Sequence, residues 1–213
     1  MHRTICDFAL DLVQNSIEAS SSLIVLDVIE TEEHITFFLS DNGAGMEPEE
    51  LEAARDPFYT SGTKHATRKV GLGIPFLVQA VEMAGGQFDI SSEKGRGTSA
   101  TFTFRLDNID TPPLGNLAET FFAALTYPGD FELVIHRKYE QQEVPAAGTG
   151  AAGRIDAGGN GSGGKAAAGG FSYTLERTKL REAAGNFEEI GSLKLLRRYI
   201  RSQEEAAPVE SVS

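Results

Sequence analysis

The sequence is poor in cysteine and in basic residues, and it contains no long hydrophobic run. Its single cysteine, Cys6, cannot form an intramolecular disulfide, which suits a reducing compartment. Lysine and arginine number 19 against 31 acidic residues, and the net charge of -12 disfavours a general nucleic-acid or anionic-membrane surface, because phosphate binding needs a basic face. No apolar run approaches the roughly 18 to 20 residues that span a bilayer, and residues 1–7 lack a signal-peptide core. We therefore expect a cytoplasmic protein that binds neither nucleic acid nor membrane.

The first half of the chain has clear hydrophobic periodicity. At 213 residues, the chain can hold one full domain and a smaller appendage. The pattern predicts helices over 7–20, 48–54 and 76–83, and strands over 23–29, 33–41, 87–92 and 98–105. The first two strands should pair antiparallel, and a glycine-rich turn at 93–97 should join the last two as a hairpin.

An acidic, glycine-rich turn, Ser40 to Met46, follows the second predicted strand. Asp41 should emerge at the strand end with its carboxylate facing outward. Gly43 and Gly45 allow positive φ and let a flat ligand approach the backbone closely. Because Asn-Gly is also the commonest hairpin turn, the motif alone leaves a ligand site and a simple turn as alternatives.

Two further polar features need an explanation. On the first predicted helix, Asp11, Asn15 and Glu18 share one stripe, which is either a solvated face or part of a site. Later, glycines precede the helix over 76–83, where free N–H groups and the helix dipole favour an anion such as phosphate. The basic segment 56–69 between them is either a surface loop or a functional lid.

Together, these segments resemble the ATP-binding domain of the GHKL superfamily, the group of DNA gyrase, Hsp90, histidine kinases and MutL that share the Bergerat fold. Residues 11–19 (DLVQNSIEA) resemble its N box, 41–45 (DNGAG) its G1 box, 56–60 (DPFYT) its F box, 71–73 (GLG) its G2 box and 95–98 (GRGT) its final glycine motif. The resemblance extends over about residues 7–106. It implies an α+β fold, a two-layer α/β sandwich with a mixed, mainly antiparallel sheet and helices on one face.

The resemblance also implies two ligands, ATP and Mg²⁺. Asp41 would accept a hydrogen bond from the adenine amino group, and Asn15 would coordinate Mg²⁺ through its amide oxygen. Gly71 and Gly73 would present backbone N–H groups to the phosphates. The segment from 58 to 70 would be the ATP lid, whose Lys64, Arg68 and Lys69 would neutralise phosphate charge. The other expected nucleotide-binding residues are Gly43, Gly45, Met46, Phe58, Thr60, Leu72 and Thr98.

Two positions depart from the family pattern. Asp11, the candidate general base, is one methylene shorter than the glutamate usual in hydrolysing members, and Lys69 stands where histidine kinases usually have glycine.

Residues 1–7 are too short for a dimerisation helix pair, and none of the histidines (His2, His34, His65, His136) is followed by an acid. We therefore expect a stand-alone protein without conventional histidine autophosphorylation. Three activities remain open: phosphotransfer in trans to a protein, as in short anti-sigma-type serine kinases; non-catalytic ATP sensing; and hydrolysis on ATP-driven dimerisation.

The second half is less informative. A connector over 107–114 should lead to a helix over 117–125 and a hairpin of strands 131–139 and 170–176, interrupted by a flexible Gly/Ala-rich insertion over 144–170. Two helices, 179–184 and the basic 190–203, should follow. The expected organisation is an ATP-binding domain over 1–108, a small C-terminal α+β module over 109–206 for a protein partner or homodimerisation, and a disordered tail over 207–213.

Overall fold

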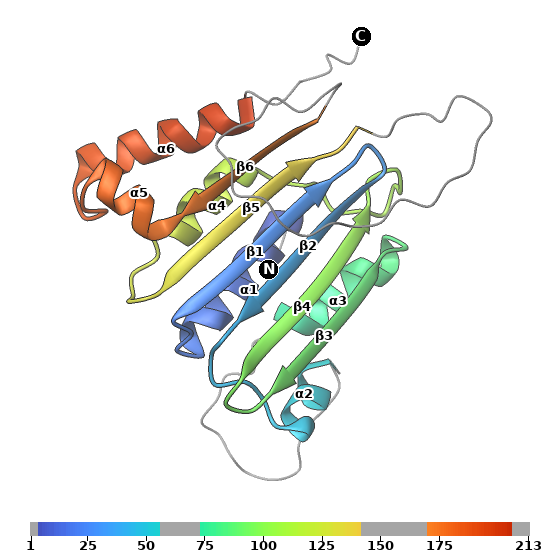
Figure 1. Ribbon diagram of the computed structural model, residues 1–213. Coiled ribbons are helices and arrows are strands. Elements are labelled where there is room, and N and C mark those ends of the chain that lie inside the picture. The colour runs from blue at the N-terminus through green and yellow to red at the C-terminus, as the bar shows by residue number, and fades with distance from the viewer. Residues whose placement is uncertain (1–3, 56–72, 142–169, 206–213) are drawn as a thin grey trace, which may run out of the picture.

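The computed structural model describes residues 4–55, 73–141 and 170–205 (Figure 1). The predicted lid and tail, and the predicted insertion except for Gly170, lie outside the described residues. No helix within the described ranges is both long and apolar enough to cross a membrane.

The helices and strands alternate along the described chain much as their periodicity predicts. In order, they are α1 (Ile5–Glu18), β1 (Leu23–Glu30), β2 (His34–Asp41), α2 (Pro48–Arg55), α3 (Gly73–Met83), β3 (Gln87–Glu93), β4 (Gly97–Arg105), α4 (Leu117–Leu125), β5 (Glu132–Tyr139), β6 (Phe171–Glu176), α5 (Arg177–Ala184) and α6 (Ile190–Glu205). Helix α1 begins two residues earlier than predicted because Thr4 and Asp7 form a capping box, in which each side chain bonds the other's backbone N–H.

The strands form one mixed sheet in the order β3-β4-β2-β1-β5-β6. Pairing is antiparallel except between β1 and β5, which run parallel. Helices α1, α3 and α4 cover one face of the sheet, and α6 packs beside α4 (Figure 1). The predicted α+β class, with a mainly antiparallel sheet and helices on one face, is confirmed.

The hydrophobic core lies between the sheet and these helices. Strand residues alternate, so that every second side chain is buried under the helices while its neighbours face the open side. Phe37 and Phe102 stack on the buried side with ring centroids 4.8 Å apart, whereas Thr36 and Thr103 hydrogen-bond across the open side at 2.9 Å. This alternation fixes the register and therefore the position of the β2 end.

The C-terminal half extends the same sheet. Strand β5 pairs with β1 along its whole length, from Leu23 opposite Glu132 to Glu30 opposite Tyr139, and β6 pairs with β5 as the predicted hairpin. Helix α4 packs against α1. The division predicted at residue 108 thus separates two stretches of sequence that share one sheet.

Candidate functional site

Asp41 lies at the end of β2 and is surrounded by hydrogen-bond donors. Its Oδ2 accepts from the Ser16 hydroxyl on α1 at 2.7 Å. Its Oδ1 accepts from the Ser21 hydroxyl at 3.0 Å and from the Gly43 backbone N–H at 2.8 Å. The strand alternation that buries Leu39 leaves Asp41 half-buried at the edge of the core. Three donors therefore fix the orientation of this carboxylate.

The glycines after Asp41 are required by close packing. Gly45 has φ +61°, and a Cβ there would lie 2.1 Å from the Glu93 carbonyl oxygen. Gly43 needs glycine for another reason, since its Cβ would lie 2.4 Å from the Ser21 hydroxyl oxygen. Because both positions lack side chains, the turn packs closely against the β3–β4 hairpin on one side and the end of α1 on the other.

A second group of predicted residues meets where α1 faces the start of α3. Asn15 Nδ2 donates to Asp11 Oδ2 at 3.4 Å, one helical turn away. Gly73, the first residue of α3, is so near that its Cβ would lie 1.8 Å from Asp11 Oδ2. Asp11 therefore lies beside the N-terminal end of another helix, and Ser16, the residue after Asn15 on α1, bonds Asp41.

Met46 and Thr98 complete the described part of the predicted site. Met46 N–H donates to the Ser92 hydroxyl at 2.9 Å, and the Ser92 and Thr98 hydroxyl oxygens lie 2.9 Å apart. Thr98 is the β4 residue opposite Asp41. The Met46 side chain is partly buried against the hydrophobic core. These contacts place both residues at the Asp41 end of the sheet.

The remaining predicted nucleotide-binding residues all lie outside the described residues. They are Phe58, Thr60, Lys64, Arg68, Lys69, Gly71 and Leu72.

Sequence reasoning missed three residues that shape this site. Ser16 and Ser21 are each 3% exposed, and Asn42 appeared only as half of an Asn-Gly turn. The Asn42 side-chain oxygen accepts from the backbone N–H groups of Ser22 at 2.9 Å and Leu23 at 3.0 Å. One usable signal was the position of Ser16 on the apolar face of α1, where a hydroxyl needs a partner.

Among the described residues, Asn15 offers an amide oxygen of the kind that Mg²⁺ takes. Within the described ranges, no cluster of three or more His, Cys, Asp or Glu side chains could hold a metal. Mg²⁺ typically takes one or two protein oxygens and fills its other positions with phosphate and water. Because Asn15 Nδ2 donates to Asp11, the Asn15 amide oxygen remains an acceptor of the required kind.

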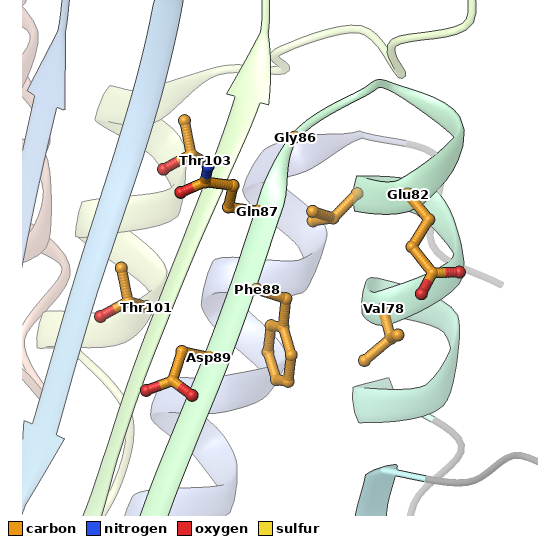
Figure 2. A pocket seen from close by; sticks show the side chains of 9 residues that line it. Val78, Glu82, Gly86, Gln87, Phe88, Asp89, Thr101 and Thr103 are labelled. Carbon is orange, nitrogen blue, oxygen red and sulfur yellow. The ribbon is translucent and has the colours of Figure 1, made fainter.

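A separate hollow lies at the edge of the sheet between α3 and β3, and its described lining includes none of the predicted site residues that the structure describes. Figure 2 shows Val78 of α3 and Phe88 of β3 in this space, with Thr101 and Thr103 of β4 nearby. It is therefore a feature distinct from the Asp41 site.

Known proteins contain segments similar in sequence to the N-terminal half of this chain. Residues 4–108 match the family model described as histidine kinase-, DNA gyrase B- and HSP90-like ATPase. This part of the chain belongs to that family. It is a histidine kinase-like ATP-binding domain, and the C-terminal half contributes two further strands to its sheet.

Several kinases contain similar segments. Sporulation kinase C of Bacillus subtilis is 29% identical over 91 residues, which cover 42% of this chain and 20% of that protein. The methanogenesis regulatory histidine kinase FilI of Methanothrix harundinacea is 39% identical over 71 residues, covering 33% and 8%. The CAI-1 autoinducer sensor kinase/phosphatase CqsS of Vibrio cholerae is 32% identical over 88 residues, covering 41% and 12%. The aligned segment thus spans a fifth or less of these relatives.

Among solved structures, the Aquifex aeolicus MutL ATPase domain complexed with ADP is similar with a TM-score of 0.35. It is 16% identical, and the match covers 64% of this chain and 61% of that one.

Proposed function

We propose that the protein binds ATP with Mg²⁺ at the Asp41 site and transfers phosphate to a separate protein, or hydrolyses ATP weakly. The observation that carries this proposal is the Asp41 carboxylate, held by three donors beside a glycine turn and connected through Ser16 to the Asp11–Asn15–Gly73 group. One end of this arrangement suits a base and the other suits phosphate and a cation.

At the base end, Asp41 would bind the adenine amino group. A carboxylate presents only acceptors, so it favours a ligand that donates at that position. Gly43 and Gly45 keep the backbone of the adjoining turn free of side chains, and the partly buried Met46 offers an apolar surface for the base. Thr98, on the strand beside Asp41, would support the base from below.

At the phosphate end, Asn15 would hold Mg²⁺ and the N-terminus of α3 at Gly73 would face the phosphates. The backbone N–H groups at that end have no intrahelical partner, and the helix dipole favours negative charge there. Bound Mg²⁺ would neutralise phosphate charge that develops during transfer. We assign Phe58, Thr60, Lys64, Lys69, Gly71 and Leu72 to the same nucleotide from the family resemblance.

In phosphotransfer, Asp11 would accept the proton of the acceptor hydroxyl. Its carboxylate lies at the Gly73 end of the site, where the terminal phosphate would bind. Phosphoryl transfer depends mainly on positioning and charge stabilisation, so a short carboxylate suffices for a slow reaction.

The alternative is a non-catalytic ATP sensor that controls a partner through the C-terminal half. One observation favours it: Asp11 Oδ2 is already contacted by Asn15 and packed against Gly73, which limits its freedom to act as a base. The sensor would bind ATP tightly, turn it over negligibly and change its affinity for a partner.

Titration calorimetry with Mg·ATP tests the binding proposal. Asp41→Asn should weaken binding by about a hundredfold or more, because the amide turns a donor toward groups that also donate. Asp27→Asn is a matched control, since Asp27 lies on the open face of the sheet beside His136. Retained affinity in Asp41→Asn would refute the adenine assignment.

Measurement of ADP release and of phosphate transfer from labelled ATP distinguishes the two functions. A phosphotransferase should label a protein in an extract and lose that activity in Asp11→Asn, whereas Asp11→Glu should release ADP faster if a longer base helps water attack. Tight Mg·ATP binding, with no labelled protein and no ADP released by wild type or by Asp11→Glu, would favour the sensor.

A further inference from the structure

We propose that Ser21 is a positioning residue that fixes the Asp41 carboxylate for the amino group of adenine. The proposal rests on nucleotide binding at Asp41 and adds a specificity role for a residue outside the family motifs identified in the sequence. Ser21 belongs to the turn between α1 and β1, and it is 3% exposed.

The hydrogen bonds described around Asp41 leave one acceptor site of its carboxylate unoccupied. A carboxylate has two oxygens and about four acceptor sites. At Oδ1, Ser21 and the Gly43 N–H occupy both sites, and at Oδ2 the Ser16 hydroxyl occupies one. The remaining acceptor site of Oδ2 can receive one further donor. With Ser21 in place, the carboxylate cannot rotate without breaking a bond at Oδ1, so this open site keeps its direction.

The backbone on both sides is shaped to bring the Ser21 hydroxyl to Asp41. Ser20 has φ +61°, and it is the one non-glycine residue with positive φ in the described parts of the chain. Ser20 is the C′ residue of a Schellman motif that ends α1, in which the Ser20 N–H donates to Ile17 O at 2.9 Å and the Ser21 N–H to Ser16 O at 3.2 Å. This helix end places Ser21 beside Asp41. Gly43 leaves room for the hydroxyl, since a Cβ there would lie 2.4 Å from Ser21 Oγ. The end of α1 and the missing side chain at Gly43 therefore together allow this contact.

Loss of the Ser21 hydroxyl should weaken recognition of the amino group specifically. In Ser21→Ala, Oδ1 would keep only the Gly43 N–H, so two hydrogen bonds instead of three would restrain the carboxylate plane. The Asp11–Asn15–Gly73 end would be unaffected because Ser21 makes no hydrogen bond to those residues among the described contacts. The loss should appear for ligands with the amino group and not for ligands without it.

The test compares Mg·ATP with Mg·purine riboside triphosphate, which has the same ring system, sugar and phosphates but no amino group. Titration calorimetry on the full chain should show that Ser21→Ala weakens ATP binding about tenfold, as expected for one charge-assisted hydrogen bond. Affinity for purine riboside triphosphate should stay unchanged. Ser21→Cys, which replaces the hydroxyl with a somewhat larger and weakly donating thiol, should fall between wild type and Ser21→Ala.

Ser22→Ala is the matched control. Its hydroxyl accepts from Asn42 Nδ2 at 2.9 Å instead of bonding Asp41, so both affinities should remain at the wild-type values. Equal weakening of both ligands in Ser21→Ala, or no weakening of ATP, would overturn the positioning role while leaving ATP binding intact. A wild-type protein that binds neither ligand would refute the proposed function together with this inference.

Discussion

Arg177, the first residue of α5, should be among the strongest single contributors to stability in the C-terminal half. Its side chain is 6% exposed and lies over the Phe131 ring, with the guanidinium carbon 4.1 Å from the ring centroid. Nε donates to Leu125 O at 2.9 Å and Nη1 to Phe131 O at 2.8 Å. Nη2 donates to Tyr127 O at 3.2 Å and Gly129 O at 3.1 Å. One side chain thus satisfies four carbonyls around the loop that joins α4 to β5.

The expected cost of Arg177→Ala is about 3–5 kcal/mol in the free energy of unfolding. Hydrogen bonds from a charged donor contribute roughly 1.5–3 kcal/mol each, which would give a larger sum. Two effects reduce it: burial lowers the pKa of Arg177, which reflects the cost of removing the charge from water, and water can reach some of the freed carbonyls. Arg177→Lys should cost about 2 kcal/mol, because an ammonium cannot reproduce the planar fork.

Urea denaturation of Arg177→Ala, Arg177→Lys and wild type measures these differences. Arg181→Ala is a matched control, because Arg181 is exposed on the same helix, and its change should stay within about 0.5 kcal/mol. Mg·ATP affinity of Arg177→Lys should equal that of wild type wherever the protein is folded. A cost below about 1 kcal/mol for Arg177→Ala would show that the carbonyls are satisfied without it, and would refute the reasoning.

Three further predictions concern the N-terminal half. Burial raises the pKa of the Cys6 thiol to about 11, so the folded state keeps a proton that the unfolded chain releases above roughly pH 8.5. The free energy of unfolding should therefore fall by up to ~1.4 kcal/mol per pH unit toward pH 11. Denaturation of Cys6→Ala should lack this pH dependence. Ser20→Gly should raise the stability by roughly 0.5–1 kcal/mol, measured as a higher melting temperature, because glycine adopts positive φ without strain. A chain ending at residue 108 should lack cooperative unfolding by circular dichroism, since it exposes the β1 edge and the face of α1 that packs on α4.

Much of the fold could be predicted from local pattern. The alternation of buried residues along β1, β2 and β4 predicts strands, and the apolar spacing along α1 predicts a helix with its core face. The parallel pairing of β1 with β5 was not predicted. These strands are separated by about a hundred residues, and hydrophobic pattern says which segments are strands but not which distant strands become neighbours.

The candidate site likewise contains some residues that the sequence predicts and others that it does not. Asp41 and its glycines could be found because they form one short motif at a strand end. The approach of Gly73 to Asp11 joins positions far apart in sequence, and no local pattern predicts it. Ser21 gave no signal at all, because a serine in a serine-rich turn becomes significant only when the φ of Ser20 directs it toward Asp41.

The sheet offers a route by which the C-terminal half contacts the Asp41 end of the sheet. In β5, the Glu132 N–H donates to the Ser22 carbonyl at 2.8 Å, and the Ser22 N–H donates to the Asn42 side chain at 2.9 Å. The Glu132 carboxylate in turn accepts from the Thr178 N–H of α5 at 3.1 Å. A sensor requires such a connection together with two alternative arrangements that ATP and a partner favour differently. A phosphotransferase requires only that the connection stay rigid. Measuring whether Asn42→Ala changes partner affinity only when ATP is bound would therefore separate the two functions at a residue that touches neither Asp11 nor Asn15.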